Sequence, residues 1–518
     1  MKVLVISLLR LGDFVQILPV LQALKTQYSI RELDVLTHHP VKQLEPMVDT
    51  VDRWFTLNRD ELQEGLGRSD LPLLTSLSVL KEQLDTIDRR KYDCVINLTQ
   101  TVYSGWIAGY LSAPQRYGLA IDVKGKAHFH SPWFQYLDDH APLDVPDIFH
   151  YTDIFHYGCG LKGGERQWGL RETRHGRAEI KALQLGEGEK IVLQTLTSDS
   201  KKTWPEESWV RMLSELQLYR PKAQFVALGA PAEEARVAGL IELCAQRGVT
   251  VRKAIVSLEG AFSLLKSASL LISGDTSIKH LANGAGVPIL ELSLGSSDYR
   301  RTGAYKEGSL ILQPQIGCAP CPHSAPCSRP SHECAERLSP AAVSSAAHHY
   351  ISGDWLSLRE LARGFQNEVR FLRTRNLASG FWMASEILES RPEAAVEKIV
   401  ERCAWKFLLN REHLDPVARF GSEGVNIRRE LESLFSPGAL PSCIQHLNFL
   451  ESQASVQGED AASHLWQNRQ RPPVAGESGV VEIGEARRAQ NQLEREKQHA
   501  MIKVKLIRSL KSQLTEAK

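Results

Sequence analysis

The residues of this chain that are best suited to chemistry lie in three loops, each between an apolar run and a helical pattern. The first loop, SGDTSIKHLA, ends the apolar run Leu270–Ser273 and contains Asp275, Thr276, Ser277 and His280. An Asp or Thr at this point is typical of a helix N-cap. The free N–H groups and the dipole of the following first turn favour a phosphate or pyrophosphate. A capped helix with a buried structural histidine fits the same spacing.

The other two loops add cations, hydroxyl groups and a carboxylate. In LTSDSKKTWPEESW, Thr197, Ser198, Lys201 and Lys202 precede a helix and offer donors and positive charge, although two lysines there also suit a solvated surface. In LLRLGDFVQILPVLQAL, Asp13 lies between an apolar strand and a helix, where a carboxylate can act as a general base. A helix cap is the alternative role for Asp13.

The elements that must position these loops alternate between strand and helix up to about residue 340. This order predicts two α/β halves, each a parallel sheet covered by helices on both faces. Ligands of such sheets bind beyond the carboxyl ends of the strands, where the three loops fall. The predicted strands are Lys2–Leu9, Arg31–Thr37, Val51–Leu57, Asp93–Leu98, Lys190–Thr195, Ala223–Leu228, Leu270–Ser273 and Val287–Leu292.

After about residue 340 the pattern becomes helical. Predicted helical segments include Leu358–Leu372, Met383–Glu389 and Glu393–Leu409, and the composition of Gln453–Glu485 indicates a flexible linker. The segment Ala486–Lys518 has nine Lys/Arg against three Glu and predicts a basic helix, either solvated or in contact with a partner or a membrane surface. The predicted divisions are 1–170 (first Rossmann-like domain), 171–350 (second domain with the cysteine-rich loop), 351–452 (helical extension), 453–485 (linker) and 486–518 (basic helix).

The overall composition excludes several classes of protein. Contents of 42% hydrophobic and 24% charged residues are typical of a globular protein. A net charge of +1 argues against a nucleic-acid partner for the chain as a whole. The apolar runs are far shorter than the roughly 20 residues of a membrane span. Because Arg10 and Asp13 interrupt the first apolar run, a buried strand is predicted there instead of a signal peptide, which indicates a cytoplasmic protein.

Four of the nine cysteines lie close together in CAPCPHSAPCSRPSHEC. The other five are scattered, which does not fit a secreted disulfide framework. The spacing C-x2-C-x5-C-x6-C suits a tetrahedral Zn or Fe site. Free thiols, or two disulfides in a surface loop, are the alternatives. The predicted ligands are Cys318, Cys321, Cys327 and Cys334.

Five stretches, taken in order, resemble glycosyltransferase family 9, the ADP-heptose:lipopolysaccharide heptosyltransferases and their relatives. The resemblance covers about residues 1–345, and no single motif in it is decisive. The matching stretches are RLGDFVQILPVLQAL, HYTDIFHYGCG, KTWPEESW, SGDTSIKHLANGAGVPILEL and GSSDYRRTGAY.

This resemblance implies a GT-B architecture, with two Rossmann-like domains facing across a cleft, to which this chain adds a C-terminal helical extension. It implies an inverting transfer of heptose from ADP-heptose, without a catalytic metal, to a glycan, lipid-linked or protein acceptor. Asp13 matches the proposed general base of the family, and Lys202 matches the lysine at the donor phosphates. The other residues that match the donor site are Thr197, Ser198, Glu233, Asp275, Thr276, Ser277 and His280, with Glu234 a close rival of Glu233.

Some members of this family carry a Cys-ligated metal finger after the second Rossmann domain, which implies here a structural metal that staples the loop and a homo-oligomer interface. Two departures from the family pattern concern the donor: Ser277 replaces a usual glycine, and Ser296-Ser297-Asp298 replaces P-T-x-P, so another nucleotide sugar stays open. A non-catalytic GT-B scaffold is the alternative function. An oxidoreductase is disfavoured because RLGD, not a G-x-G-x-x-G turn, follows the first strand.

Overall fold

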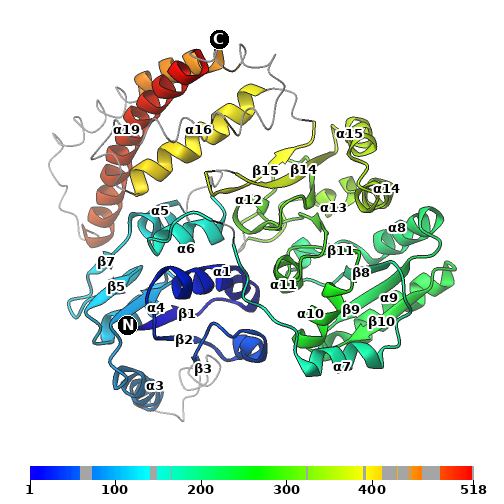
Figure 1. Cartoon of the computed structure of the whole chain (residues 1–518), viewed down its shortest axis with the longest axis horizontal. Helices are drawn as coiled ribbons and strands as arrows, with labels where there is room; N and C mark the ends of the chain where they lie inside the picture. Colours follow the sequence, from blue (N-terminus) through cyan, green and yellow to red (C-terminus); the bar gives the residue numbers. More distant parts are fainter. Residues whose placement is uncertain are drawn as a thin grey trace. The chain divides into compact units, whose positions relative to one another are not determined.

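The chain forms two compact units, described by a computed structural model (Figure 1). The first unit comprises Met1–Ser131, His150–Arg375 and Trp382–Leu388, and the second comprises Pro132–Phe149, Asn376–Phe381 and Glu389–Lys518. The structure describes residues 1–58, 73–140, 149–164, 166–322, 325–377, 379–388, 392–410, 427, 429, 443, 445–457 and 479–515.

The first half of unit 1 is a parallel sheet with strand order β3-β2-β1-β4-β5. Residues Val3–Ile6 of β1 are fully buried, as expected for a parallel strand covered on both faces. A short hairpin of β6 and β7 follows this sheet. The strands are β1 Lys2–Ser7, β2 Glu32–His38, β3 Arg53–Leu57, β4 Cys94–Asn97, β5 Gln115–Tyr117, β6 Leu119–Ile121 and β7 Ala127–Phe129. The helices are α1 Leu11–Gln27, η1 His39–Met47, α3 Leu73–Asp88, α4 Val102–Tyr110 and α6 Tyr151–Gly158.

The second half of unit 1 contains a sheet with strand order β10-β9-β8-β11-β12-β13-β14-β15. Its strands are parallel from β10 to β13, and β14 pairs antiparallel with β13. The strands are β8 Lys190–Gln194, β9 Gln224–Gly229, β10 Val251–Ile255, β11 Leu270–Ser273, β12 Ile289–Leu292, β13 Leu310–Pro314, β14 Val369–Asn376 and β15 Trp382–Glu386. The helices are α7 Arg174–Ala182, η2 Ser200–Lys202, α8 Glu206–Tyr219, η3 Pro231–Glu233, α9 Glu234–Gln246, α10 Leu258–Lys266, α11 Ser277–Ala285, α12 Tyr299–Thr302, α13 Glu333–Arg337, α14 Pro340–Ile351 and α15 Trp355–Gly364. Both sheets therefore agree with the predicted α/β halves.

The prediction of helix at Leu358–Leu372 and Met383–Glu389 was wrong in part. The first segment is helical only to Gly364, where α15 ends, and then enters β14, while the second begins in β15. In VRFLRTRN the alternation of apolar and charged residues is that of a strand, and Val369 and Phe371 are buried while Arg370 is exposed. This segment is a strand because it pairs with β13 and so extends the sheet. From the sequence, no strand of this sheet was predicted after Val287–Leu292.

The HYTD segment ties the two halves of unit 1 together. Asp153, at the start of α6, accepts hydrogen bonds from the hydroxyl of Tyr305 at 2.5 Å and from the N–H of Trp382 at 2.9 Å. The guanidinium of Arg166 lies 3.3 Å from the same carboxylate. His150 contacts the carbonyl of Gly303 at 3.1 Å through Nε2. The sequence motif therefore has a structural role, in which a buried carboxylate of the first half is held by groups of the second.

Unit 2 contains the described helices α5 Pro132–His140, α16 Pro392–Leu409 and α19 Gly479–Thr515. Trp405 of α16 stacks on His499 of α19, with ring centroids 4.5 Å apart. Glu401 lies 2.7 Å from Lys503, and Glu451 lies 2.6 Å from Arg508. Part of the positive charge of the predicted basic helix is thus neutralised within the unit. The predicted linker falls mostly outside the described residues, which stop at 457 and resume at 479.

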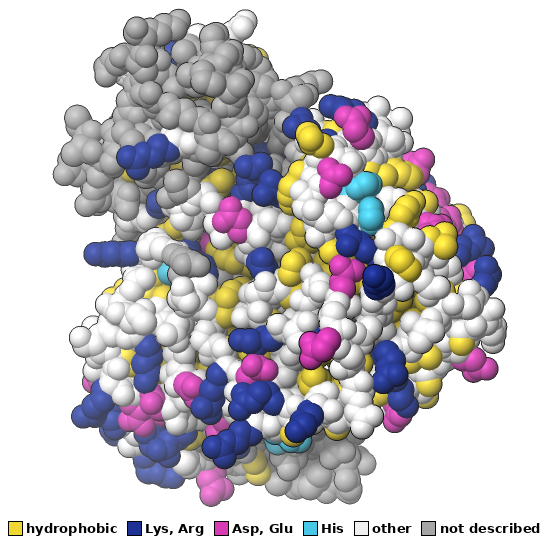
Figure 2. Space-filling model, turned by 45° about the vertical axis from the view of Figure 1, so that its right-hand side comes forward, with side chains coloured by type: hydrophobic (Ala, Val, Ile, Leu, Met, Phe, Trp, Pro, Cys, Tyr) yellow, Lys and Arg dark blue, Asp and Glu magenta, His cyan; other side chains and the backbone are white. Residues whose placement is uncertain are grey.

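Charges on the surface are mixed. On the face shown in Figure 2, Lys and Arg side chains lie among Asp, Glu and uncharged residues wherever side chains are described. Within the described residues, we find no helix with the length and apolar character that crossing a membrane requires.

Candidate functional site

The loop after β11 forms the N-terminus of α11. Thr276 is the N-cap: its side chain accepts a hydrogen bond from the N–H of Lys279 at 3.4 Å and lies 3.1 Å from the hydroxyl of Ser273. Asp275 precedes the cap, and Ser277 is the first helical residue. Since the hydroxyl of Thr276 already caps the helix, this loop offers a ligand chiefly the remaining first-turn N–H groups and the side chain of Ser277.

The loop after β8 brings Lys202 to Asp275. Because β8 and β11 are parallel neighbours, their carboxyl ends lie at one edge of the sheet. Nζ of Lys202 lies 2.6 Å from Oδ2 of Asp275, and Lys202 is 8% exposed. Two of the predicted residues therefore form a direct ion pair, and the reading of Lys202 as a solvated surface lysine is wrong.

The hydroxyl of Thr197 forms hydrogen bonds within the loop after β8. It lies 2.6 Å from the hydroxyl of Thr203 and donates to the carbonyl of Asp199 at 2.7 Å. A Cβ atom added to Gly274 would approach the methyl carbon of Thr197 to 3.2 Å, so the two loops pack directly on each other. Ser198 is exposed in this loop.

His280 lies one turn into α11, with Nε2 3.6 Å from Oδ1 of Asp275. Its Nδ1 is buried and has no hydrogen-bond partner among the described residues. Burial, and then the positive charge of Lys279, lower the pKa of His280 to about 4. The imidazole is therefore neutral near pH 7 and can supply a hydrogen bond but no charge.

Asp13 reaches this cluster from the other half of unit 1. It lies in the first turn of α1, whose N-cap is Arg10, so Asp13 is not the cap itself. A Cβ atom added to Gly12 would lie 3.3 Å from both Cδ2 of His280 and Cα of Ser277, which places the start of α1 against the start of α11. The two halves thus bring the predicted carboxylate to the predicted anion site.

The electrostatic setting of Asp13 suits a proton acceptor. Burial raises the pKa of Asp13, and the charge of Asp275 raises it further, while Arg10 and Lys202 oppose both effects. A carboxylate with a raised pKa binds a proton more firmly than one with an ordinary pKa. A general base needs this property in order to accept a proton.

Glu233 is less directly connected to this cluster. It lies in η3 beyond β9, at the same edge of the sheet, and its Oε2 accepts a hydrogen bond from the N–H of Ala230 at 2.9 Å. Its rival Glu234 pairs with Lys253 at 2.6 Å. Glu233 thus lies at the edge of the sheet where the ligand is expected. Its described hydrogen bond is to a residue of its own turn.

Sequence reasoning missed two buried charged residues of the site. Lys279 lies 2.8 Å from both Asp275 and Glu291, and the side chains of Lys279 and Glu291 are 0% and 1% exposed. Two signals were present in the sequence: a lysine four residues after Asp275 on a helix, and a glutamate inside the apolar strand ILEL.

The cysteine-rich loop packs against the Lys202 loop. Nζ of Lys201 donates to the carbonyls of Pro322 at 2.9 Å and Ala325 at 2.6 Å. Nε2 of His332 contacts the carbonyl of Lys201 at 2.9 Å. Cys321 donates through its N–H to the carbonyl of Gly295 at 2.9 Å. The loop therefore holds the neighbour of Lys202 in place.

The four cysteines of this loop are free thiols with different exposures: Cys334 is buried, Cys318 and Cys321 are half-buried, and Cys327 is exposed. Burial raises the pKa of the Cys321 thiol, and the other three cysteines raise it further. Across the described part of the chain, no group of three or more His, Cys, Asp or Glu side chains is arranged to hold a metal ion. The structure therefore does not support the predicted Zn or Fe site.

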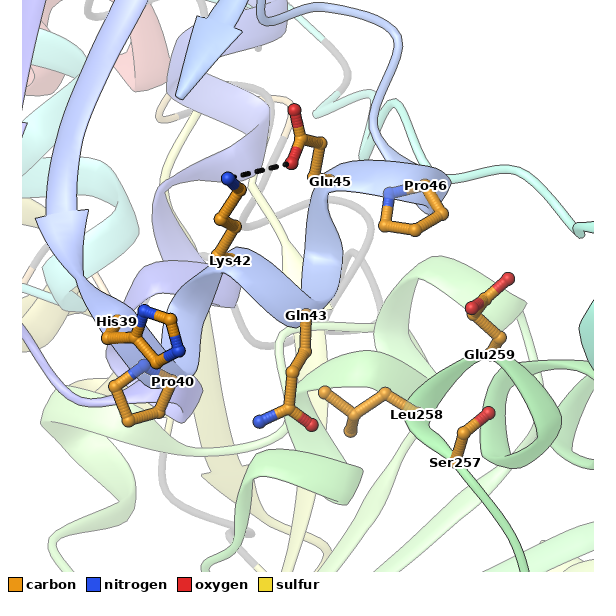
Figure 3. Close-up of a pocket in the computed structure, with 9 residues that line it drawn as sticks. All are labelled: His39, Pro40, Lys42, Gln43, Glu45, Pro46, Ser257, Leu258 and Glu259. Atoms are coloured by element: carbon orange, nitrogen blue, oxygen red, sulfur yellow. Dashed lines mark ion pairs between the residues drawn. The ribbon is translucent and has the colours of Figure 1, made fainter. Parts of the chain in front are cut away.

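A pocket of about 410 Å³ opens between η1 and the N-terminus of α10 (Figure 3). Lys42 and Glu45 form an ion pair of 3.8 Å at its rim, and Ser257, Leu258 and Glu259 line the opposite side. None of the predicted site residues lines it. The pocket therefore provides no support for their roles.

The two Rossmann-like halves have the architecture of the GT-B fold, the class of fold that this chain shares with glycosyltransferases. Comparison with known proteins agrees. Residues 82–330 match the model of glycosyltransferase family 9 (heptosyltransferase).

Two curated relatives and one solved structure are similar to this chain. The lipopolysaccharide heptosyltransferase 1 of Escherichia coli O18:K1:H7 is 22% identical over 60% of this chain and 91% of its own length. The protein of the same name from Escherichia coli K12 is 22% identical over 60% and 93%. The crystal structure of the glycosyl transferase family 9 from Veillonella parvula DSM 2008 superposes with a TM-score of 0.52, at 17% identity, over 68% of this chain and 97% of that one. This structural similarity shows a shared fold.

Proposed function

We propose that this protein is an inverting, metal-independent glycosyltransferase that moves a heptose-type sugar from ADP-heptose to a lipopolysaccharide core or to another glycan or protein acceptor. The single observation that carries the proposal is the convergence of Asp13 with the Lys202–Asp275 ion pair. A base from one half and a cation from the other are the two groups that such a transfer needs. The name of the curated relatives supports the choice of donor.

In the proposed reaction, Asp13 takes the proton of an acceptor hydroxyl while that oxygen attacks the anomeric carbon. A new C–O bond forms there, and the bond from the anomeric carbon to the diphosphate oxygen breaks with inversion. The electron pair of the broken bond leaves with ADP, and Lys202 stabilises the negative charge that develops on it. Since both oxygens of Asp275 contact lysines, this carboxylate is occupied in the charge network of the site.

The remaining donor contacts follow from position at the sheet edge. The first-turn N–H groups of α11, with Ser277, would face the diphosphate. His280 would donate a hydrogen bond as a neutral imidazole. The other proposed donor contacts are Thr197, Ser198, Asp275, Thr276 and, at the ribose, Glu233.

A donor panel tests the proposal. Purified protein is incubated with several nucleotide sugars and an acceptor preparation, and release of the nucleotide is measured. Release of ADP from ADP-heptose that depends on the acceptor supports the proposal, and release from a different nucleotide sugar corrects the donor. Calorimetric titration with ADP tests the alternative of a non-catalytic scaffold, because a scaffold would show no binding and no turnover.

A structural metal ion at the four cysteines stays a prediction, which rests on the thiolate ligands alone. Four thiolates within seventeen residues suit Zn or Fe. Elemental analysis of protein purified without added metal checks this: about one Zn or Fe per chain supports it, and loss of the metal in a Cys318→Ser/Cys321→Ser variant would assign the site.

The cellular setting is also proposed. Buried free thiols such as Cys94, Cys159 and Cys244 suit the reducing cytoplasm. The basic residues of α19 would allow contact with an anionic membrane or with a second copy of the chain. Cosedimentation with anionic liposomes, with and without residues 486–518, tests the membrane contact, and equal binding of both proteins would contradict it.

A further inference from the structure

Lys279 is a buried lysine whose hydrogen-bonding capacity is used up inside the protein. Its side chain is 0% exposed. Nζ donates to Oδ1 of Asp275, to Oε1 of Glu291 and to the carbonyl of Thr302, each at 2.8 Å. An ammonium group carries three protons, so these three acceptors take all of them. Lys279 therefore acts on a ligand only through its neighbours.

Asp275 is the neighbour that connects Lys279 to the site. Lys279 contacts its Oδ1, and Lys202 contacts its Oδ2 at 2.6 Å. Burial would raise the pKa of Asp275, but Lys279, then His280 and Lys202, outweigh burial and hold that pKa well below its usual range. The carboxylate is thus ionised and shared between two lysines.

The charges in this network decide how available Lys202 is. With Glu291 ionised, the charges of the two lysines and of the carboxylates of Asp275 and Glu291 sum to zero. With Glu291 protonated, the total charge is +1. In either state, removing Lys279 lowers the sum by one and leaves Lys202 as the remaining lysine partner of Asp275. An arriving diphosphate would then compete for Lys202 with a carboxylate that has lost its other ion pair.

Lys279 also fixes the geometry of the site. Glu291 lies at the end of β12, and its second oxygen accepts a hydrogen bond from the N–H of Ala304 at 2.7 Å. The ammonium group thereby joins α11, β12 and the segment after α12 at one point. Lys279 contacts one oxygen of Asp275 and Lys202 contacts the other.

We propose that Lys279 is a positioning residue, which shares the charge of Asp275 and so weakens the hold of this carboxylate on Lys202, the lysine that binds the diphosphate of the donor. This inference rests on the proposed function, because it assumes that a nucleoside diphosphate binds at Lys202.

The experiment compares ADP with adenosine as probes of the wild type, Lys279→Met and Lys279→Arg. In Lys279→Met, the affinity for ADP is expected to fall by roughly tenfold to a hundredfold, the value of a charge-assisted contact. The affinity for adenosine is expected to stay unchanged, because adenosine has no phosphate. Lys279→Arg keeps a cation beside Asp275 and should restore most of the affinity for ADP.

Lys81→Met is the matched control, because it removes a lysine from an exposed ion pair with Asp85 on α3. This variant should bind ADP as the wild type does. Lys279→Met leaves an unpaired carboxylate buried, so Lys279→Met/Glu291→Gln is prepared as well, and thermal melting confirms the fold of each protein. The double variant should still bind ADP weakly.

Two outcomes overturn the inference alone. One is an affinity for ADP in folded Lys279→Met equal to that of the wild type. The other is an equal loss of affinity for ADP and for adenosine, which would mean that Lys279 has only a structural role. A wild-type protein that does not bind ADP would overturn the proposed function, and this inference with it.

Discussion

Nζ of Lys202 lies 2.6 Å from Oδ2 of Asp275, although 73 positions separate the two residues in the chain. The pair joins the loops that follow the neighbouring strands β8 and β11. Because Asp13 of the first half is close enough for both charges to act on its pKa, the three side chains belong to one cluster.

Replacing Lys202 by Met should remove most of the turnover. The variant loses the cation proposed to stabilise the leaving diphosphate, and loss of one such contact lowers kcat by about a hundredfold to a thousandfold. Affinity for ADP should fall too. Lys253→Met, at an exposed ion pair, is the control and should keep both properties. Normal turnover in Lys202→Met would contradict the proposed role.

Replacing Asp13 by Asn should abolish turnover and preserve binding of ADP. The amide keeps the shape of the side chain but cannot accept the proton of the acceptor hydroxyl. Nucleotide release measures turnover, and calorimetry measures binding. Asp49→Asn, at an exposed ion pair with Arg171, should behave like the wild type. If Asp13→Asn turned over at the normal rate, another group would be the base.

The same Asp13→Asn variant should be more stable than the wild type at pH 7. Burial, followed by the charge of Asp275, raises the folded-state pKa of Asp13 above 3.8. Between pH 3.8 and that raised pKa the folded protein binds the proton more tightly than the unfolded chain, so stability falls as pH rises through this window. The amide of Asn carries no charge at any of these pH values, so the variant avoids this loss of stability. Melting temperatures from pH 7 downward should show the advantage shrinking as pH approaches 3.8, and a constant difference would contradict it.

Replacing Lys201 by Met should loosen the cysteine-rich loop and raise KM for the donor. Nζ of Lys201 holds the carbonyls of Pro322 and Ala325, and the next residue is Lys202. Limited proteolysis should cut this loop faster in the variant, and steady-state kinetics should show a larger effect on KM than on kcat. Lys190→Met serves as the control, since its Nζ bonds only to the nearby carbonyl of Gly188 in the described contacts. Unchanged proteolysis would show that Lys201 does not hold the loop.

The sequence predicted the strands and loops well, because buried parallel strands are short apolar runs and the chemical residues follow directly after them. It also predicted that Asp13, Lys202 and Asp275 belong to one site. Sequence reasoning could not decide whether Asp13 capped its helix, since the choice depends on where the chain enters α1. The structure assigns the cap to Arg10.

The failures have a common physical cause, which is pairing between distant residues. The strand β14 was assigned to a helix although its apolar and charged residues alternate, because its partner β13 lies more than fifty residues earlier and the local sequence does not show the pairing. Lys279 was missed because its partner Glu291 lies on a different element and meets it only in the folded chain. A glutamate within an apolar strand was the available sign that a buried cation had to be near.

Replacing Asp153 by Asn should destabilise unit 1 more than most single substitutions. The carboxylate is 0% exposed and accepts from Tyr305 and from the N–H of Trp382, beside a guanidinium of Arg166 whose side chain is 6% exposed. The amide would leave this buried guanidinium without its charge partner, which costs about 3–5 kcal/mol. Urea denaturation measures the loss. In the double variant Asp153→Asn/Arg166→Met the unpaired charge is gone, so its loss should be smaller than the sum of the single losses. Simple additivity would mean that the two residues act independently.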